Sequence, residues 1–211
     1  MDTFDGIPVA ALDFYERLEA NNNRQWWLEH KDEYDGAVRL PLTALLSGLE
    51  PHFGPGKLFR PYRDMRLSSA AEPYKTAQGM FVSTFEGVGF YLQVSADGLL
   101  LGGGFHSTAP AQLSRFRAAV DASGSGKAVE AILAELLAAG FTIEGQKLKT
   151  VPRGFPKDHP RQELLKYKTL SASLTLGRPE WLSTRAAQER IANYWEQLRP
   201  LIGWITRYAA P

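Results

Sequence analysis

The amino-acid sequence predicts an α+β fold, in which an antiparallel sheet meander packs against N-terminal, middle and C-terminal helices. Three observations lead to this prediction. Apolar residues recur at helical spacing over residues 8–53 and again over residues 184–205. Between them, residues 80–94 alternate apolar with smaller or polar side chains, as in half-buried strands. Neighbouring strands flanked by separate groups of helices are typical of the α+β class.

The size and composition indicate one ordinary globular domain. A chain of 211 residues that is 44% hydrophobic and 22% charged can bury a sizeable core, so we predict a single domain over residues 1–211. No apolar run is long enough to span a membrane, and Asp2 and Asp5 stand where a signal peptide needs basic residues. We therefore expect a soluble protein without a membrane partner. The lack of cysteine excludes disulfides and thiolate sites, and it favours a cytoplasmic location.

Two N-terminal helices follow from local signals. Pro8 is predicted to open the first, and Asn22 or Asn23 to cap the second. Pro41 should kink or split the second helix, and Gly54 should end it. The predicted inner faces carry Val9, Leu12, Tyr15 and Leu18 in the first helix, then Trp27, Tyr34, Val38, Leu42, Leu45 and Leu49 in the second.

Strands are predicted at residues 57–67, 80–85 and 88–94, with Asp97-Gly98 as a type I′ hairpin turn. In the first of these, two-residue alternation places Arg63 with the apolar side chains. A half-buried guanidinium needs carboxylates, carbonyl oxygens or a bound anion, because an unpaired one costs several kcal/mol. Pro61 indicates an edge strand or a bulge.

The second half of the chain alternates helices with short strands. Pro110 should begin a helix, and a further helix should turn Val129, Ile132, Leu133, Leu136 and Leu137 inward and end at Gly140. Short strands are expected at residues 141–145 and 171–176, with a proline-rich loop at 147–160 and a short helix at 163–168 between them. The C-terminal helix should start after Ser183 or Thr184.

Positive charge is concentrated in two windows although the whole chain carries a net charge of only +1. Residues 57–75 hold five Lys or Arg side chains and two carboxylates, and residues 147–168 hold seven and two. Two basic segments on an otherwise acidic chain indicate an anion site if folding brings them together. The alternative is that both are solvated loops.

Two glycine-rich stretches resemble phosphate-binding loops only in part. The stretch SGSGK at 123–127 has Asp121 in place of the first glycine and Ala128 in place of the final hydroxyl residue, so we interpret it as a turn between helices. The glycines at 102–104, next to His106, are interpreted as a tight turn. The four histidines form no metal-binding pair at helical spacing, so neither a metal site nor a cofactor is predicted.

Several motifs together resemble a family of conserved hypothetical proteins, a domain of unknown function. They are, in order, LDFYERLEANNNRQWWLEHKDEY, FRPYRDMRLS, PYKT, GGGF, PRGFPKDHPRQELLKYKTL and RPLIGWI. The resemblance covers nearly the whole chain and implies a single-domain architecture, but it implies no activity. Members of that family usually carry lysines between RLS and PYK, whereas this chain has Ser69, Ala70, Ala71 and Glu72.

The leading functional hypothesis is a pocket for a phosphate-bearing small molecule or another anion, because guanidinium groups bond phosphate in two places at once. Whether the protein is an enzyme is left open. If it is one, His159 is the candidate for proton transfer, since histidine ordinarily titrates near neutral pH. The predicted ligand-binding residues are Arg60, Arg63, Arg66, Lys75, Arg153, Arg161 and Lys166, supported by Asp64, Tyr74 and Asp158.

Two alternatives remain open. In the first, the protein is a non-catalytic interaction domain whose basic segments are internal salt-bridge ties. In the second, it binds a nucleic-acid backbone, which a net charge of only +1 disfavours. The sequence predicts no oligomeric state.

Overall fold

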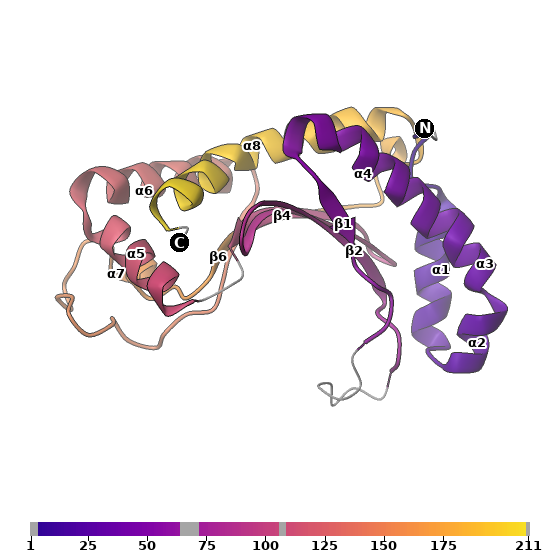
Figure 1. Cartoon of the computed structure of the whole chain (residues 1–211), viewed down its shortest axis with the longest axis horizontal. Coiled ribbons are helices and arrows are strands. Elements are labelled where there is room, and N and C mark those ends of the chain that lie inside the picture. The colour runs from indigo at the N-terminus through magenta and orange to yellow at the C-terminus, as the bar shows by residue number, and fades with distance from the viewer. Residues whose placement is uncertain (1–3, 64–71, 106–108, 210–211) are drawn as a thin grey trace. The chain divides into compact units, whose positions relative to one another are not determined.

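The structure confirms the α+β prediction. It is a computed structural model that describes residues 4–63, 72–105 and 109–209 (Figure 1). Six strands form one antiparallel sheet in the order β1-β2-β3-β4-β6-β5, with helices packed against it. The strands are β1 (Gly56–Leu58), β2 (Ala77–Phe85), β3 (Val88–Ser95), β4 (Gly98–Phe105), β5 (Thr142–Glu144) and β6 (Leu170–Gly177).

Helices precede, interrupt and follow these strands. None of the described helices is long and apolar enough to cross a membrane. The helices are α1 (Val9–Ala20), α2 (Arg24–Glu29), α3 (Lys31–Glu33), the π-helix η1 (Tyr34–Arg39), α4 (Leu40–Phe53), α5 (Pro110–Asp121), α6 (Ser123–Ala138), α7 (Gln162–Leu165), the 3-10 helix η2 (Glu180–Ser183) and α8 (Ala186–Tyr208).

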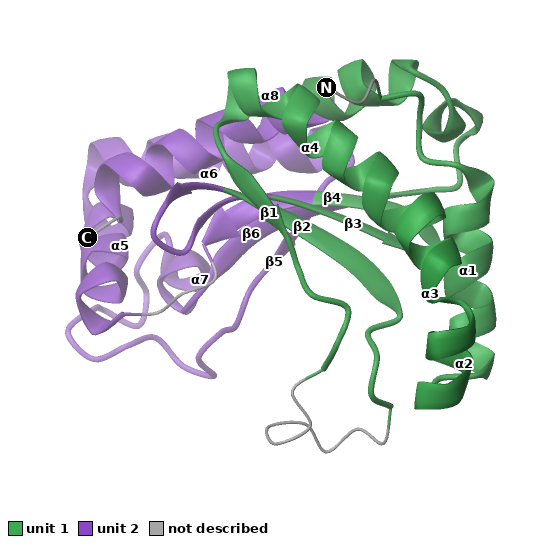
Figure 2. Ribbon diagram, turned by 45° about the vertical axis from the view of Figure 1, so that its right-hand side comes forward, with its two compact units in different colours: residues 1–82, 91–101, 175–193 green, residues 83–90, 102–174, 194–211 purple. Residues whose placement is uncertain are grey.

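The chain divides into two compact units, each built from several separate stretches (Figure 2). Unit 1 comprises residues 1–82, 91–101 and 175–193, and unit 2 comprises residues 83–90, 102–174 and 194–211. The first basic window belongs to unit 1 and the second to unit 2. The prediction of one domain over the whole chain stays a prediction.

In unit 1 the N-terminal helices form largely as their sequence predicts. The side chain of Asn23 caps α2 by accepting a hydrogen bond from the Trp26 amide at 3.0 Å. The predicted second helix is interrupted at His30, and from Lys31 the backbone stays helical through the π-helical turn η1 into α4, so the helix is not split at Pro41. The predicted inner faces are buried except at Val9, which is 59% exposed.

Two predictions about the strands of unit 1 are wrong. Residues 59–63 are not part of β1, which ends at Leu58; only an isolated bridge pairs Tyr62 with Tyr74. The hairpin between β3 and β4 turns at residues 96–97, and Gly98 is already the first residue of β4. No described residue other than glycine has a positive φ, so the turn is not type I′; Gly98 itself takes φ +107°. As Pro61 indicated, β1 lies at an edge of the sheet.

In unit 2, the structure contradicts the interpretation of both glycine-rich stretches as turns. Glycines 102–104 form part of β4 rather than a tight turn, and a Cβ added at Gly104 would lie 2.2 Å from the Leu170 carbonyl oxygen of β6. The stretch 123–127 forms the first turn of α6. In the same helix, Val129, Leu133 and Leu136 are buried as predicted, whereas Leu137 is 57% exposed.

Candidate functional site

In unit 1, backbone pairing brings the two ends of the first basic window together. The Arg63 amide donates to the Pro73 carbonyl at 2.9 Å, and the Lys75 amide donates to the Pro61 carbonyl at 2.8 Å. These bonds flank the bridge between Tyr62 and Tyr74. Three cationic side chains, Arg60, Arg63 and Lys75, therefore emerge from two adjacent segments; we call them the basic cluster.

The basic cluster is only weakly matched by carboxylates. The Lys75 ammonium donates to the Arg60 carbonyl at 3.0 Å and lies 5.6 Å from the centre of the Phe59 ring. Arg63 donates through Nε to the Tyr74 carbonyl at 3.0 Å, while its Nη2 is 3.8 Å from the Glu72 carboxylate. That distance exceeds hydrogen-bond length. Among the described residues, the Arg60 guanidinium has no carboxylate partner.

The pKa of Lys75 is a second indication of excess positive charge in the cluster. Partial burial, together with the charges of Arg60 and Arg63, holds the pKa of the Lys75 ammonium below its usual range. A cation whose neighbours are cations gains from any anion that binds among them. The basic cluster therefore favours a negatively charged partner more strongly than a pair of matched ions would.

A buried aromatic layer holds the cluster in place. Tyr74, a predicted supporting residue, is 5% exposed and stacks on Trp27 with ring centres 4.3 Å apart. The side chain of Asn22 accepts from the Tyr74 amide and donates to its carbonyl, at 3.1 and 3.0 Å. The ring stack and the two hydrogen bonds to Asn22 therefore hold the segment from which Lys75 projects.

A buried glutamine joins the same layer to the neighbouring strand. Gln78 is 1% exposed, accepts from the Tyr34 hydroxyl at 2.7 Å, and donates to the Phe59 carbonyl at 2.6 Å. Burial raises the pKa of Tyr34 to about 12, so its hydroxyl remains a donor at neutral pH. No local pattern predicts this pairing, because 44 residues separate the two side chains.

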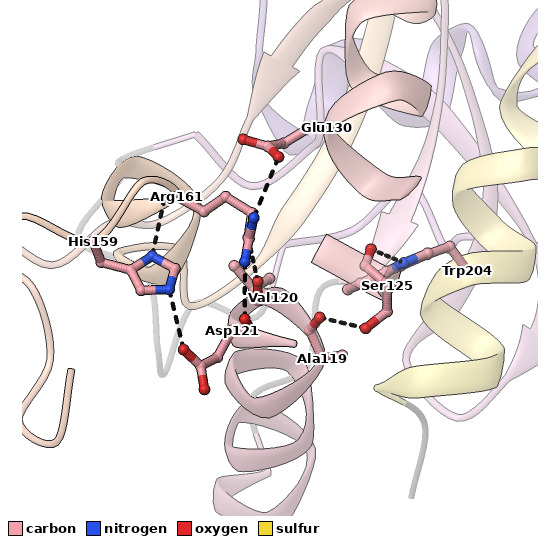
Figure 3. A network of polar contacts seen from close by, with 8 residues as sticks. All are labelled: Ala119, Val120, Asp121, Ser125, Glu130, His159, Arg161 and Trp204. Carbon is pink, nitrogen blue, oxygen red and sulfur yellow. Dashed lines mark hydrogen bonds and ion pairs between the residues drawn. The ribbon is translucent and has the colours of Figure 1, made fainter. Parts of the chain in front are cut away.

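In unit 2, by contrast, the Arg161 guanidinium is paired with acceptors from the protein (Figure 3). Arg161 is 8% exposed, and its guanidinium donates to the carbonyls of Val120 at 2.6 Å and Asp121 at 2.8 Å. Its third nitrogen lies 3.7 Å from the Glu130 carboxylate. The carbonyls belong to the last turn of α5, where helices leave backbone acceptors unmatched. Arg161 therefore acts as a C-terminal cap for α5.

The start of α6 completes this cap. The Ala122 amide donates a hydrogen bond to the Ala118 carbonyl at 3.0 Å, and the Ser125 hydroxyl donates one to the Ala119 carbonyl at 2.6 Å. Together with Arg161, these groups satisfy all of the last four carbonyls of α5. The Ser125 carbonyl in turn accepts from the Trp204 indole at 2.9 Å, which joins the corner to α8 (Figure 3).

Gly126 explains part of the SGSGK stretch. A Cβ at this position would lie 2.3 Å from the Val120 carbonyl oxygen and 2.4 Å from Nε of Arg161. Real Cβ atoms do not approach other atoms so closely, so only glycine leaves room for the guanidinium. The stretch has a structural use that is unrelated to phosphate.

His159 is poorly placed for proton transfer. It is 8% exposed, its Nδ1 accepts from the Arg161 amide at 2.9 Å, and its Nε2 lies 3.1 Å from the Asp121 carboxylate. Because Nδ1 accepts, the neutral ring carries its proton on Nε2 and donates it to Asp121. Both nitrogens are then occupied, which leaves neither for a substrate. The geometry fits a structural role, and the catalytic role stays a prediction.

The remaining predicted site residues are dispersed. The ammonium of Lys166 bonds the carboxylate of Glu163, three residues earlier in the chain, and this bond lowers the pKa of Glu163. Arg153 and Asp158 are exposed and have no ion-pair partner among the described residues. Asp64, Arg66 and His106 lie outside the described residues. The pocket that would join the two basic windows stays a prediction.

Unit 2 also contains an open groove of about 420 Å³ beside α6 and α7. Its charged lining consists of Lys147 and Arg161 against Glu130 and Glu163. The ammonium of Lys147 lies 4.2 Å from the centre of the Tyr167 ring. Its charges are balanced, so the groove lacks the surplus of cations seen in the basic cluster of unit 1.

The described residues contain no group of three or more histidine, aspartate or glutamate side chains that could hold a metal ion. The chemistry that the basic cluster offers is the binding of a multivalent oxyanion, because arginine and lysine donate several charge-assisted hydrogen bonds and accept none.

Fold and site together define an α+β protein with a partly exposed, weakly matched group of cations on one of its units. The chain belongs to the family described as conserved hypothetical protein (DUF2461), which matches residues 10–204. This confirms the resemblance noted from the motifs. No curated protein and no solved structure matches the chain.

Proposed function

We propose that the protein binds a phosphate-bearing small molecule at the basic cluster of unit 1, through Arg60, Arg63 and Lys75. The single observation that supports this proposal is that these cations lie together and that, among the residues the structure describes, the one carboxylate paired with them is that of Glu72, at 3.8 Å from Arg63. A cytoplasmic location, which the cysteine-free composition favours, is part of the same proposal.

The cluster suits phosphate because its donors can reach several oxygens of one group. Arg63 uses Nε for the Tyr74 carbonyl, and its Nη2 lies 3.8 Å from the Glu72 carboxylate, beyond hydrogen-bond length. Among the described residues, its terminal nitrogens therefore make no hydrogen bond that an oxyanion would have to replace. Lys75 donates one of its three N–H groups to the Arg60 carbonyl, which leaves two for a ligand. A bound dianion would also relieve the repulsion among the three cations, which adds to the binding free energy.

A nucleic-acid backbone is the less favoured partner for this cluster. Affinity for a long strand grows with the number of phosphates that are neutralised. The described cluster offers three cations, and Glu72 lies among them. A compact anion with two or more charges fits this small number better.

The test is a titration of the wild-type protein with inorganic phosphate and pyrophosphate, followed by thermal unfolding. A bound ligand at a hundredfold excess over its dissociation constant should stabilise the protein by about 2.7 kcal/mol. Lys75→Met should abolish most of this effect, because it removes a charge from the cluster while keeping a similar length. Arg60→Ala should weaken it as well.

Lys127→Met is the matched control. Lys127 is exposed on α6 in unit 2, so the substitution removes the same charge outside the cluster. It should leave phosphate stabilisation unchanged. Equal losses in both lysine variants would show a general charge effect, and no stabilisation of the wild-type protein by any phosphate would refute the proposal.

A further inference from the structure

One face of the sheet in unit 1 is incompletely covered. In β2, Met80 is fully buried whereas its neighbour Phe81 is half-buried. In the adjacent strand β3, Leu92 is fully buried whereas Tyr91 is half-buried. Because successive side chains of a strand point to opposite faces, these two strands bury one face in the core and leave the other partly open.

Two aromatic rings, Phe59 and Tyr91, lie together on this open face; we call them the aromatic pair. Their centres are 6.2 Å apart and their planes are tilted by 32°. Both rings cover Gly79, where an added Cβ would lie 2.7 Å from the Tyr91 hydroxyl oxygen and 3.0 Å from Cδ2 of Phe59. The Tyr91 hydroxyl donates to the side-chain carbonyl of Gln93 at 2.9 Å, which holds that ring in place.

The aromatic pair lies directly beside the basic cluster. The Lys75 ammonium is 5.6 Å from the centre of the Phe59 ring, and it donates to the Arg60 carbonyl at 3.0 Å. The ammonium is also close enough to Arg60 and Arg63 for their charges to contribute to the lowering of its pKa. An anion that accepts a hydrogen bond from Lys75 therefore has the Phe59 ring as its neighbour.

We propose that the basic cluster takes a small phosphate monoester of an aromatic alcohol, with the phosphate on Lys75 and its neighbouring arginines and the ring against the aromatic pair. This inference rests on the proposed function and adds the class of ligand to it. A ring that leaves water for the surface of the aromatic pair gains from apolar burial and from ring–ring contacts. Because Tyr91 is already held by Gln93, little side-chain freedom is lost when the ring binds.

The contribution of the ring is separable from that of the phosphate. Phenyl phosphate and methyl phosphate carry the same charged group, and at about pH 8 both are mainly dianions, because a phosphate monoester loses its second proton at about pH 6. If the ring lies against the aromatic pair, phenyl phosphate should bind the wild-type protein about ten-fold more tightly than methyl phosphate. Calorimetric titration measures both affinities.

Phe59→Leu and Tyr91→Leu assign this difference to the aromatic pair. Each variant removes one ring and keeps an apolar side chain, so each should reduce the ten-fold preference to about three-fold or less, with a much smaller change in the affinity for methyl phosphate. Phe85→Leu is the matched control. Phe85 is 37% exposed and is the last residue of β2, whereas Lys75 precedes the first, so this variant should keep the full preference. Thermal unfolding checks that each variant is folded.

A measurement on the wild-type protein does not depend on any variant. Nuclear Overhauser effects should join the phenyl protons of the bound ester to the ring protons of Phe59 and Tyr91. Their absence, or a preference for phenyl phosphate that persists in both leucine variants, would overturn the inference.

The outcomes separate the two proposals. If phenyl phosphate and methyl phosphate bind equally well, the inference is wrong while the anion site stands. If neither ester binds and inorganic phosphate does not bind either, the proposed function fails together with the inference. A short phosphotyrosine peptide that binds more tightly than phenyl phosphate would overturn the assignment of the site to a small molecule.

Discussion

Lys75 in unit 1 and Arg161 in unit 2 come from basic windows that look alike in sequence, yet their surroundings differ. Arg161 is buried and bonds two carbonyls at the end of α5. Lys75 is partly buried beside other cations, and its burial together with their charges lowers its pKa. A count of charges does not distinguish these cases. What distinguishes them is how completely the fold matches the donors: the buried Arg161 guanidinium has two carbonyl acceptors and a nearby carboxylate, whereas the Lys75 ammonium has one carbonyl acceptor.

The largest effect should come from Arg161→Ala. It removes two charge-assisted hydrogen bonds and leaves the Val120 and Asp121 carbonyls without a donor, so we expect a loss of about 3 kcal/mol in the free energy of unfolding. For a chain of this size, the midpoint of thermal unfolding should fall by roughly 6–12 °C.

Arg153→Ala is the control for that experiment, because Arg153 is an exposed arginine of the same window. It should change the free energy of unfolding by no more than about 0.5 kcal/mol. If the two variants unfold at the same temperature, Arg161 does not stabilise the end of α5, and the contrast drawn between Arg161 and Lys75 is wrong.

Gly126→Ala should follow in size. The added methyl group would displace either the guanidinium or the end of α5, which should cost about 1–3 kcal/mol by overpacking. Gly124→Ala lies two residues earlier in the same helix and meets nothing within 4 Å. It should stabilise the protein by about 0.4–1 kcal/mol, because alanine restricts the unfolded chain. Chemical denaturation of both variants tests this; effects of the same sign would argue against the cap geometry.

Arg63→Ala sharpens the comparison from the other side. The Arg63 side chain is 33% exposed and makes one hydrogen bond to a carbonyl, so its removal should cost about 1 kcal/mol and leave the protein folded. Circular dichroism and thermal unfolding measure this. Global unfolding of the variant would instead support the alternative that the first window, like the second, is an internal tie.

The smallest effect should be the pH dependence due to Lys75. Its pKa is lower in the folded protein than in the unfolded chain, so between those two values the unfolded state binds more protons. The free energy of unfolding should therefore rise with pH from the lowered pKa up to the ordinary lysine value. The difference in unfolding free energy between wild type and Lys75→Met, followed by urea titration at several pH values, should grow with pH. A flat difference would show that burial and the neighbouring cations do not lower the pKa of Lys75.

Local signals were sufficient to predict much of the fold. Helical periodicity located α1 and α4, the side chain of Asn23 caps α2 as expected, and Val88, Phe90 and other alternating residues of β3 are buried. Such features depend on neighbours a few residues away. The turn before β4 was misplaced by one residue, because Asp-Gly also suits a turn in which only the glycine has positive φ.

The candidate site was harder to predict, because its contacts join residues that are far apart in the sequence. The acceptors of Arg161 lie about 40 residues away in sequence, so its role as a cap left no local trace. By charge alone, Arg161 is therefore indistinguishable from the cations of residues 57–75. Arg63, in contrast, was expected to be half-buried from strand alternation, and it is, although the segment pairs only through an isolated bridge.

The order of the sheet places the three-residue strands β1 and β5 at its two edges. An edge strand presents unpaired amide and carbonyl groups to which a strand of another molecule can add. A strand of only three residues offers few such groups, and a foreign strand gains little by pairing with it. Short edge strands are one of the ways in which a sheet avoids serving as a template for another chain.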